Sequence, residues 1–99
     1  MPLTIQQTKV LRSRAHVLKP VVIVGQNGLT ENVLNEIDQS IDHHELIKVR
    51  VNATDRQQRT ERIEQIAATT KSEIVQVVGH IAVLYRHNPQ RNAISLPKP

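Results

Sequence analysis

Residues 19–30 read KPVVIVGQNGLT, and this stretch decides how the chain folds. Four branched aliphatic residues in a row, 21–24, predict a strand that is apolar on both faces and therefore interior to a sheet. The run leads directly into Gly25-Gln26-Asn27-Gly28, after which a helical pattern begins. A strand, a bend bounded by glycines and a helix thus follow one another without a linker, which is typical of an α/β domain.

Apolar periodicity along the rest of the chain predicts three helices and four strands in the order α-β-α-β-α-β-β. The expected helices cover 4–18, 31–44 and a segment capped within 52–55 that continues to about Thr70; the expected strands cover 21–24, 46–51, 73–78 and 81–86. Right-handed crossovers would put the second and third helices on the same side of the sheet. We predict a two-layer α/β sandwich with a mixed four-stranded sheet, which ends in an antiparallel hairpin with a type II′ turn at Gly79-His80.

Length and composition indicate one small domain. We expect residues 1–99 to form it, with an ordered core over about 3–87 and a mobile C-terminal tail, 88–99, that docks through Ile94 and Leu96. The chain has no cysteine, no apolar run of the kind found in a signal peptide and no stretch long enough to span a membrane. We therefore expect a soluble, cytoplasmic monomer that does not associate with a membrane.

The charge of the chain points to a polyanionic partner. Lys and Arg outnumber Asp and Glu by 13 to 9, which gives a formal net charge of +4 and a pI near 10.0. Such a domain attracts nucleic acid over a long range, although many small proteins are basic for solubility alone. Tyr85 is the only Phe, Tyr or Trp, which excludes RNA-binding modules that stack bases on several exposed rings. A bound nucleic acid would be held mainly through its backbone and by charge.

The Gly25-Gln26-Asn27-Gly28 bend has a chemical use at this position. Glycine permits positive φ and leaves no Cβ to block an approaching group. A bend between a strand and a helix N-terminus presents backbone N–H groups to an anion, typically a phosphate. The alternative is an ordinary tight turn. The motif is neither a Walker loop nor a dinucleotide fingerprint. Its nearest physical analogue is the GXXG loop with which KH domains clamp nucleotide backbone.

Three blocks of the sequence resemble one family in order and spacing: KPVVIVGQNGLTENVLNEI, HHELIKVRV and VQVVGHIAVLYR. They resemble the CRM domain, named for chloroplast RNA splicing and ribosome maturation, and are most similar to its stand-alone bacterial, YhbY-type form. The resemblance covers about residues 3–97. It implies a fold similar to the C-terminal domain of translation initiation factor 3, a GxxG loop that binds RNA, and association with precursors of the large ribosomal subunit. His80 departs from the family, which usually has Lys or Arg there. A largely neutral imidazole puts a phosphate contact from the hairpin tip in doubt.

By position, the resemblance assigns the RNA-binding loop to Gly25, Gln26, Asn27 and Gly28. Basic side chains flank the loop, take family-like positions or extend the surface; they are Lys19, Lys9, Arg12, Arg86, Lys48 and Arg50. A single Lys or Arg is more often a solvated surface charge than a contact. The prediction of an RNA-binding site therefore rests on the cluster as a whole. Through this site the protein would bind ribosomal RNA of the immature large subunit and assist its assembly.

Other charged residues favour other interpretations. Arg56, Arg59 and Arg62 alternate with acidic residues, which favours an ion-paired, solvated helix face over an RNA contact. The second expected helix carries acidic side chains on its outer face; they belong to residues 31, 36, 38, 42 and 45. This face supports a competing hypothesis, in which the protein is a non-catalytic interaction module that binds a protein on the ribosome or in another complex.

We expect no metal, cofactor, catalytic residue or small-molecule substrate. His43 and His44 are adjacent on a helix and point about 100° apart, and no further residues with zinc-ligand spacing join them. No nucleophile–base pair, carboxylate pair or cofactor motif occurs. The sequence therefore predicts a binding protein and not an enzyme.

Overall fold

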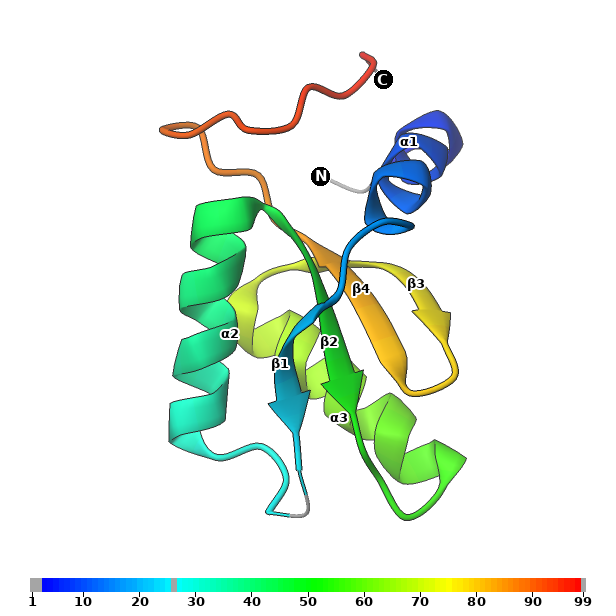
Figure 1. Cartoon of the computed structure of the whole chain (residues 1–99), viewed down its shortest axis with the longest axis vertical. Helices are drawn as coiled ribbons and strands as arrows, with labels where there is room; N and C mark the ends of the chain where they lie inside the picture. The colour runs from blue at the N-terminus through cyan, green and yellow to red at the C-terminus, as the bar shows by residue number, and fades with distance from the viewer. Residues whose placement is uncertain (1–2, 26, 99) are drawn as a thin grey trace.

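The computed structural model describes residues 3–25 and 27–98, and it has the predicted element order (Figure 1). The helices are α1 (Ile5–Ala15), α2 (Glu31–His44) and α3 (Arg56–Thr70), and the strands are β1 (Pro20–Val24), β2 (Leu46–Val51), β3 (Glu73–Val78) and β4 (Ile81–Tyr85). None of the helices in the described ranges is long and apolar enough to cross a membrane.

Each helix begins at a side chain that satisfies a free backbone N–H group. Thr4 forms a capping box with Gln7, Thr30 accepts from Val33 N, and Asp55 accepts from Gln58 N. Helix α1 ends at Ala15, three residues before the predicted end at residue 18. Leu18, which belongs to the apolar stripe that predicted the longer helix, follows the helix and is exposed.

The four strands form one mixed sheet in the order β1-β2-β4-β3. Strands β1 and β2 are parallel, and β4 is antiparallel to both of its neighbours. Gly79 has a φ of +57°, which the predicted II′ turn requires at its first central residue. Helices α2 and α3 cover one face, as predicted, and they enclose a core of aliphatic side chains that includes Ile37, Ile66 and Leu84 (Figure 1).

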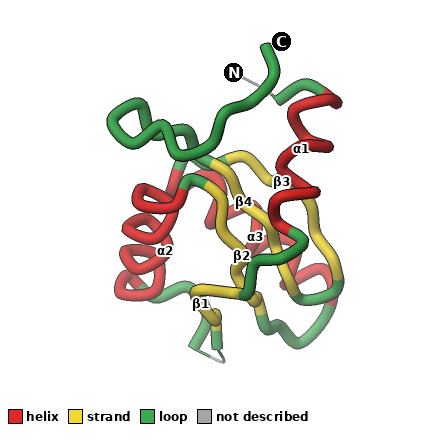
Figure 2. Tube along the Cα trace, turned by 45° about the horizontal axis from the view of Figure 1, so that its top comes forward, coloured by secondary structure: helices red, strands yellow, loops and turns green. Residues whose placement is uncertain are grey.

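The other face of the sheet is partly covered as well, which the two-layer prediction did not include. Helix α1 lies over that face (Figure 2). It packs there through Leu11 and Ala15 onto a second core that contains Val83 and Tyr85. The reason is that α1 precedes β1 and takes part in no crossover, so the handedness of the crossovers does not restrict it to the face that α2 and α3 cover.

The C-terminal segment docks on this second core. Ile94 is buried and Leu96 packs beside it. The segment is also held by hydrogen bonds: Ala93 N donates to the fully buried Glu45 Oε2 (2.6 Å), and Gln7 Nε2 donates to Pro97 O (2.9 Å). Burial, and secondarily the Glu45 carboxylate, raises the pKa of Tyr85, so this phenol stays neutral at physiological pH.

Truncation of Leu11 tests the packing of α1. Leu11→Ala should lower the free energy of unfolding by about 3 kcal/mol, because the side chain is fully buried and its loss leaves a cavity. Ile5→Ala on the same helix is the control; its side chain is 80% exposed, so the change should stay within about 0.5 kcal/mol. Urea denaturation followed by circular dichroism measures both. Equal effects of the two substitutions would contradict this packing.

Candidate functional site

Three turns meet at one end of the sheet. The loop after β1 lies beside the turn after β2, because Asn52 N donates to Val24 O (3.1 Å). The β3–β4 turn joins them, because Val51 N donates to His80 O (2.7 Å). In Figure 1 the loop between β1 and α2 and the turn between β2 and α3 both lie at the bottom of the view. We call this region the loop end of the molecule.

The glycine-bounded loop is a tight bend that remains open to solvent. Gly28 N donates to Gly25 O (3.1 Å), and Gly28 has a φ of +72°. Gly25 and Asn27 are exposed, whereas Gly28 is buried. Gln26 lies outside the described residues. The loop is therefore neither packed inside the protein nor closed by the elements around it.

Only part of the predicted N–H array is available to an anion. Gly28 N is used inside the bend, Thr30 N donates to Gly28 O, and Val33 N donates to the Thr30 side chain. Within the described ranges, the N–H groups of Glu31 and Asn32 have no acceptor in the protein. These two amides lie at the positive end of the α2 dipole, where they can donate to an anion at the loop.

Arg62 is a neighbour of the loop that the sequence did not reveal. Its Nη1 donates to Asn52 O (2.6 Å), and its Nη2 lies 3.1 Å from the point where a Cβ on Gly28 would stand. The positive φ of Gly28 favours glycine, and the absence of a Cβ leaves room for the guanidinium of Arg62 beside it. Arg50 reaches the same turn from β2, with Nε 3.4 Å from Asn52 Oδ1. Asn52 therefore brings two arginines to the base of the loop.

The predicted ion-paired face of α3 is not present. The ion pairs within the described ranges do not include Arg56, Arg59 or Arg62. Arg59 instead lies 3.4 Å from the His80 ring through its Nη1. The spacing of three between these arginines was visible in the sequence and indicated one helix face. The spacing did not show how far these arginines lie from the carboxylates beside them. Within the described ranges, that distance is too long for an ion pair.

The predicted cations are distributed over several surfaces. Arg50 stands at the loop end, and Lys48 shares with Arg12 a groove on the face of the sheet that α1 partly covers. Lys9 is exposed on α1. Lys19 precedes β1, so the whole strand separates it from the loop, a length of about 17 Å. Its surroundings include His44 and Ile94, at the opposite end of the molecule. Lys19 therefore does not flank the loop as predicted.

Comparison with known proteins identifies the family of this chain. The family profile of the CRS1 / YhbY (CRM) domain matches residues 3–86. The chain belongs to this family. It is 47% identical over 96 residues to a Haemophilus influenzae protein named "RNA-binding protein", with 97% of this chain and 96% of the relative covered. It is 44% identical over 92 residues to a Pseudomonas aeruginosa protein named "Probable RNA-binding protein", with 93% and 88% covered.

A solved structure has the same fold as this CRM domain. The solution structure of a hypothetical protein from Staphylococcus aureus superposes with a TM-score of 0.83 at 38% sequence identity, and 97% of this chain and 100% of that chain are covered. The α/β fold with the order α-β-α-β-α-β-β, a mixed four-stranded sheet and three helices is thereby confirmed.

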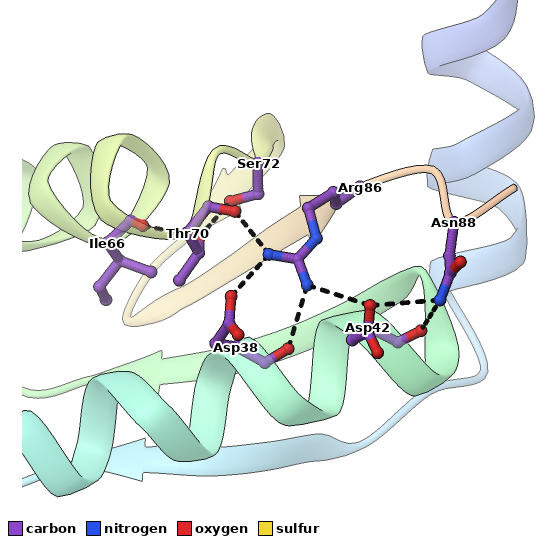
Figure 3. A network of polar contacts seen from close by, with 7 residues as sticks. All are labelled: Asp38, Asp42, Ile66, Thr70, Ser72, Arg86 and Asn88. Atoms are coloured by element: carbon purple, nitrogen blue, oxygen red, sulfur yellow. Dashed lines mark hydrogen bonds and ion pairs between the residues drawn. The ribbon is translucent and has the colours of Figure 1, made fainter. Parts of the chain in front are cut away.

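Arg86 of this CRM domain, predicted to bind RNA as a family-like basic position, makes structural contacts away from the loop. Its Nη1 contacts Asp38 Oδ1 (2.6 Å) and Thr70 O (2.7 Å), and its Nη2 lies 3.6 Å from Asp42 Oδ1 (Figure 3). The residue follows β4, whose end pairs with the start of β2, so it lies at the end of the sheet opposite the loop. The physical reason is that its charge is used to join α2 to the end of α3.

The adjacent histidines of the CRM domain, His43 and His44, lie at the C-terminal end of α2. The rings of His43 and His44 meet edge to face at a centroid distance of 4.6 Å. Among the residues that the structure describes, no group of three or more His, Cys, Asp or Glu side chains is arranged to hold a metal ion. The pair closes the last turn of α2, where a cationic or polar group suits the helix dipole.

Removal of the Arg86 side chain tests its structural role. Arg86→Ala should lower the free energy of unfolding by about 2 kcal/mol, because Thr70 O loses its charged donor and two carboxylates lose their partner. The expected loss of stability is moderate because both carboxylates are more than half exposed, and ion pairs with exposed groups contribute little. Arg91→Ala, at an exposed position of the C-terminal segment, is the control and should change stability little. Chemical denaturation of both variants provides the comparison, and an unchanged Arg86→Ala midpoint would refute the role.

Proposed function

We propose that this CRM domain protein binds RNA through its loop end, and that its target in the cytoplasm is ribosomal RNA of the immature large subunit, whose assembly it assists as a monomer. The observation that carries the proposal is the open bend at Gly25 and Asn27, which stands between the α2 N-terminus and the arginines beside Asn52. The RNA-binding names of the relatives support the same chemistry.

The proposed contact is with the sugar–phosphate backbone. A phosphate at the bend would accept from the Glu31 and Asn32 amides, and Asn27 would donate from its side chain to a phosphate or sugar oxygen. Arg50, with Lys48 and Arg12 on the same face of the sheet, would supply long-range attraction. Binding of this kind depends steeply on salt and only weakly on base sequence.

The competing hypothesis of a protein-binding acidic α2 face is weakened by the contacts of that helix. Asp38 and Asp42 pair with Arg86, and Asn88 Nδ2 donates to Asp42 Oδ1 (3.2 Å). Glu45, counted with that face, is fully buried under the C-terminal segment. Three of the five acidic residues of this face thus take part in contacts of the fold, although Asp38 and Asp42 remain more than half exposed.

Two carboxylates placed in the loop test the proposal. Gln26→Asp combined with Asn27→Asp should weaken binding to a ribosomal RNA fragment by at least about tenfold at moderate salt, because two anions would replace the phosphate at the helix N-terminus. The measurement is a gel shift or fluorescence anisotropy, with circular dichroism to verify the fold.

The control for this variant carries the same change in net charge elsewhere. Gln6→Glu combined with Gln39→Glu places two carboxylates at exposed helix positions outside the loop. It should weaken binding far less than the loop variant. If the folded loop variant binds as well as wild type, or if the control loses as much affinity, the loop mechanism is wrong.

A further inference from the structure

A polar pocket opens next to the loop, on the side of α3. It has a volume of about 540 Å³ and is lined by Asn52, Ala53, Thr54, Gln58 and Arg62. Gln58 is held in place, because its Oε1 accepts from Thr54 N (2.8 Å) and Thr54 Oγ1 (3.1 Å). Thr54 and Gln58 thus satisfy each other, and Arg62 is the charged group of the pocket.

Arg62 is fixed and half-buried, and its charge is not neutralised by the protein. One guanidinium nitrogen is anchored on Asn52 O at 2.6 Å, which leaves the other donors of the planar group directed elsewhere. None of the ion pairs in the described ranges involves this residue. Partial removal of a cation from water is unfavourable unless an anion compensates it. A fixed guanidinium in an open pocket is therefore suited to an anionic ligand.

The position of Arg62 beside the loop indicates the chemical class of this anionic ligand. The guanidinium touches the surface of Gly28, so an anion at Arg62 is next to whatever occupies the loop. Arginine binds phosphate oxygens with paired donors in a fork geometry. Arg59 precedes it by one turn on the same helix and leads toward His80 at the hairpin. Cationic groups thus continue from the loop across the first half of α3.

We propose that Arg62 binds a backbone phosphate of the RNA strand, adjacent to the phosphate at the loop, and that the strand leaves the loop over α3 toward Arg59 and His80. The inference rests on the proposed function, because it extends the same site. It gives Gly28 a second purpose, which is to let this guanidinium stand within reach of the strand. His80, whose contact was in doubt, becomes a neighbour of the path through Arg59.

The salt dependence of binding tests Arg62 specifically. We would measure the affinity for a labelled single-stranded ribosomal RNA fragment by fluorescence anisotropy between low and moderate KCl. Arg62→Gln should weaken binding by about tenfold at low salt, as expected for loss of a charged hydrogen bond. It should also reduce the slope of log K against log salt by about 0.7, because one phosphate contact fewer releases its counterion. A purely structural role would lower affinity without changing this slope.

Two variants serve as controls. Arg62→Lys keeps the charge and should keep the slope while affinity falls less than in Arg62→Gln, because an ammonium group lacks the fork. Arg91→Gln removes the same charge from the exposed C-terminal segment and should keep the wild-type slope. Thermal denaturation verifies that each variant is folded. A wild-type slope for Arg62→Gln, or an equal loss of slope for Arg91→Gln, would overturn the assignment.

The outcomes separate this inference from the proposed function. If the loop variant loses RNA affinity and Arg62→Gln does not, RNA binding at the loop stands and only the Arg62 assignment fails. If neither variant loses affinity, the loop mechanism itself is wrong. AMP at constant ionic strength distinguishes a free nucleotide from an RNA strand: displacement of RNA from wild type, but not from Arg62→Gln, by micromolar AMP would overturn the assignment to a strand.

Discussion

The parallel pairing of β1 with β2 is the constraint on which the rest of the structure depends. Val24 pairs with Val51, so both strands end at the same edge of the sheet. A parallel pair requires a crossover, here α2, and the handedness of crossovers puts α2 and α3 over one face. The loop after β1 and the turn after β2 are neighbours for the same reason. Asn52 can then bond to Val24 while its carbonyl accepts from Arg62.

The two ends of the sheet use charge in different ways. Away from the loop, Arg86 pairs with Asp38 and the buried Glu45 holds the C-terminal segment, so charge there joins elements of the fold. At the loop end, the hydrogen bonds that Arg59 and Arg62 make within the described ranges go to the His80 ring and to a backbone carbonyl, and not to a carboxylate. Three acidic side chains thus stabilise the fold at the end away from the loop, whereas Arg59 and Arg62 take part in none of the ion pairs of the described ranges and stand where a polyanion is proposed to bind.

The type and order of the helices and strands could be predicted from the sequence because buried side chains recur along the chain at a spacing that differs between helices and strands. The spacing of Ile37 and Ile41 on α2 reports which side chains are covered. The branched run at β1 predicted a strand correctly, but its expected place in the interior of the sheet is wrong: β1 is an edge strand, and Val21 and Ile23 are exposed. The pattern misleads where an apolar residue is not buried, as at Leu18, which extended the predicted first helix beyond the end of α1. A period also shows that a helix has an apolar stripe without showing which face of the sheet it covers. For this reason the second core under α1 was missed.

By itself, the sequence determined the element order, the glycine-bounded bend between strand and helix, and the excess of positive charge. The tertiary structure alone decided which cations stand at that bend. Lys19 is close to Gly25 along the chain, but an extended strand advances about 3.3 Å per residue and carries the two apart. Arg62 is distant along the chain, yet strand pairing and the packing of α3 place it against Gly28. A sequence pattern reports only on residues that are close along the chain. Which distant residues become neighbours in space is decided by strand pairing and helix packing between distant segments.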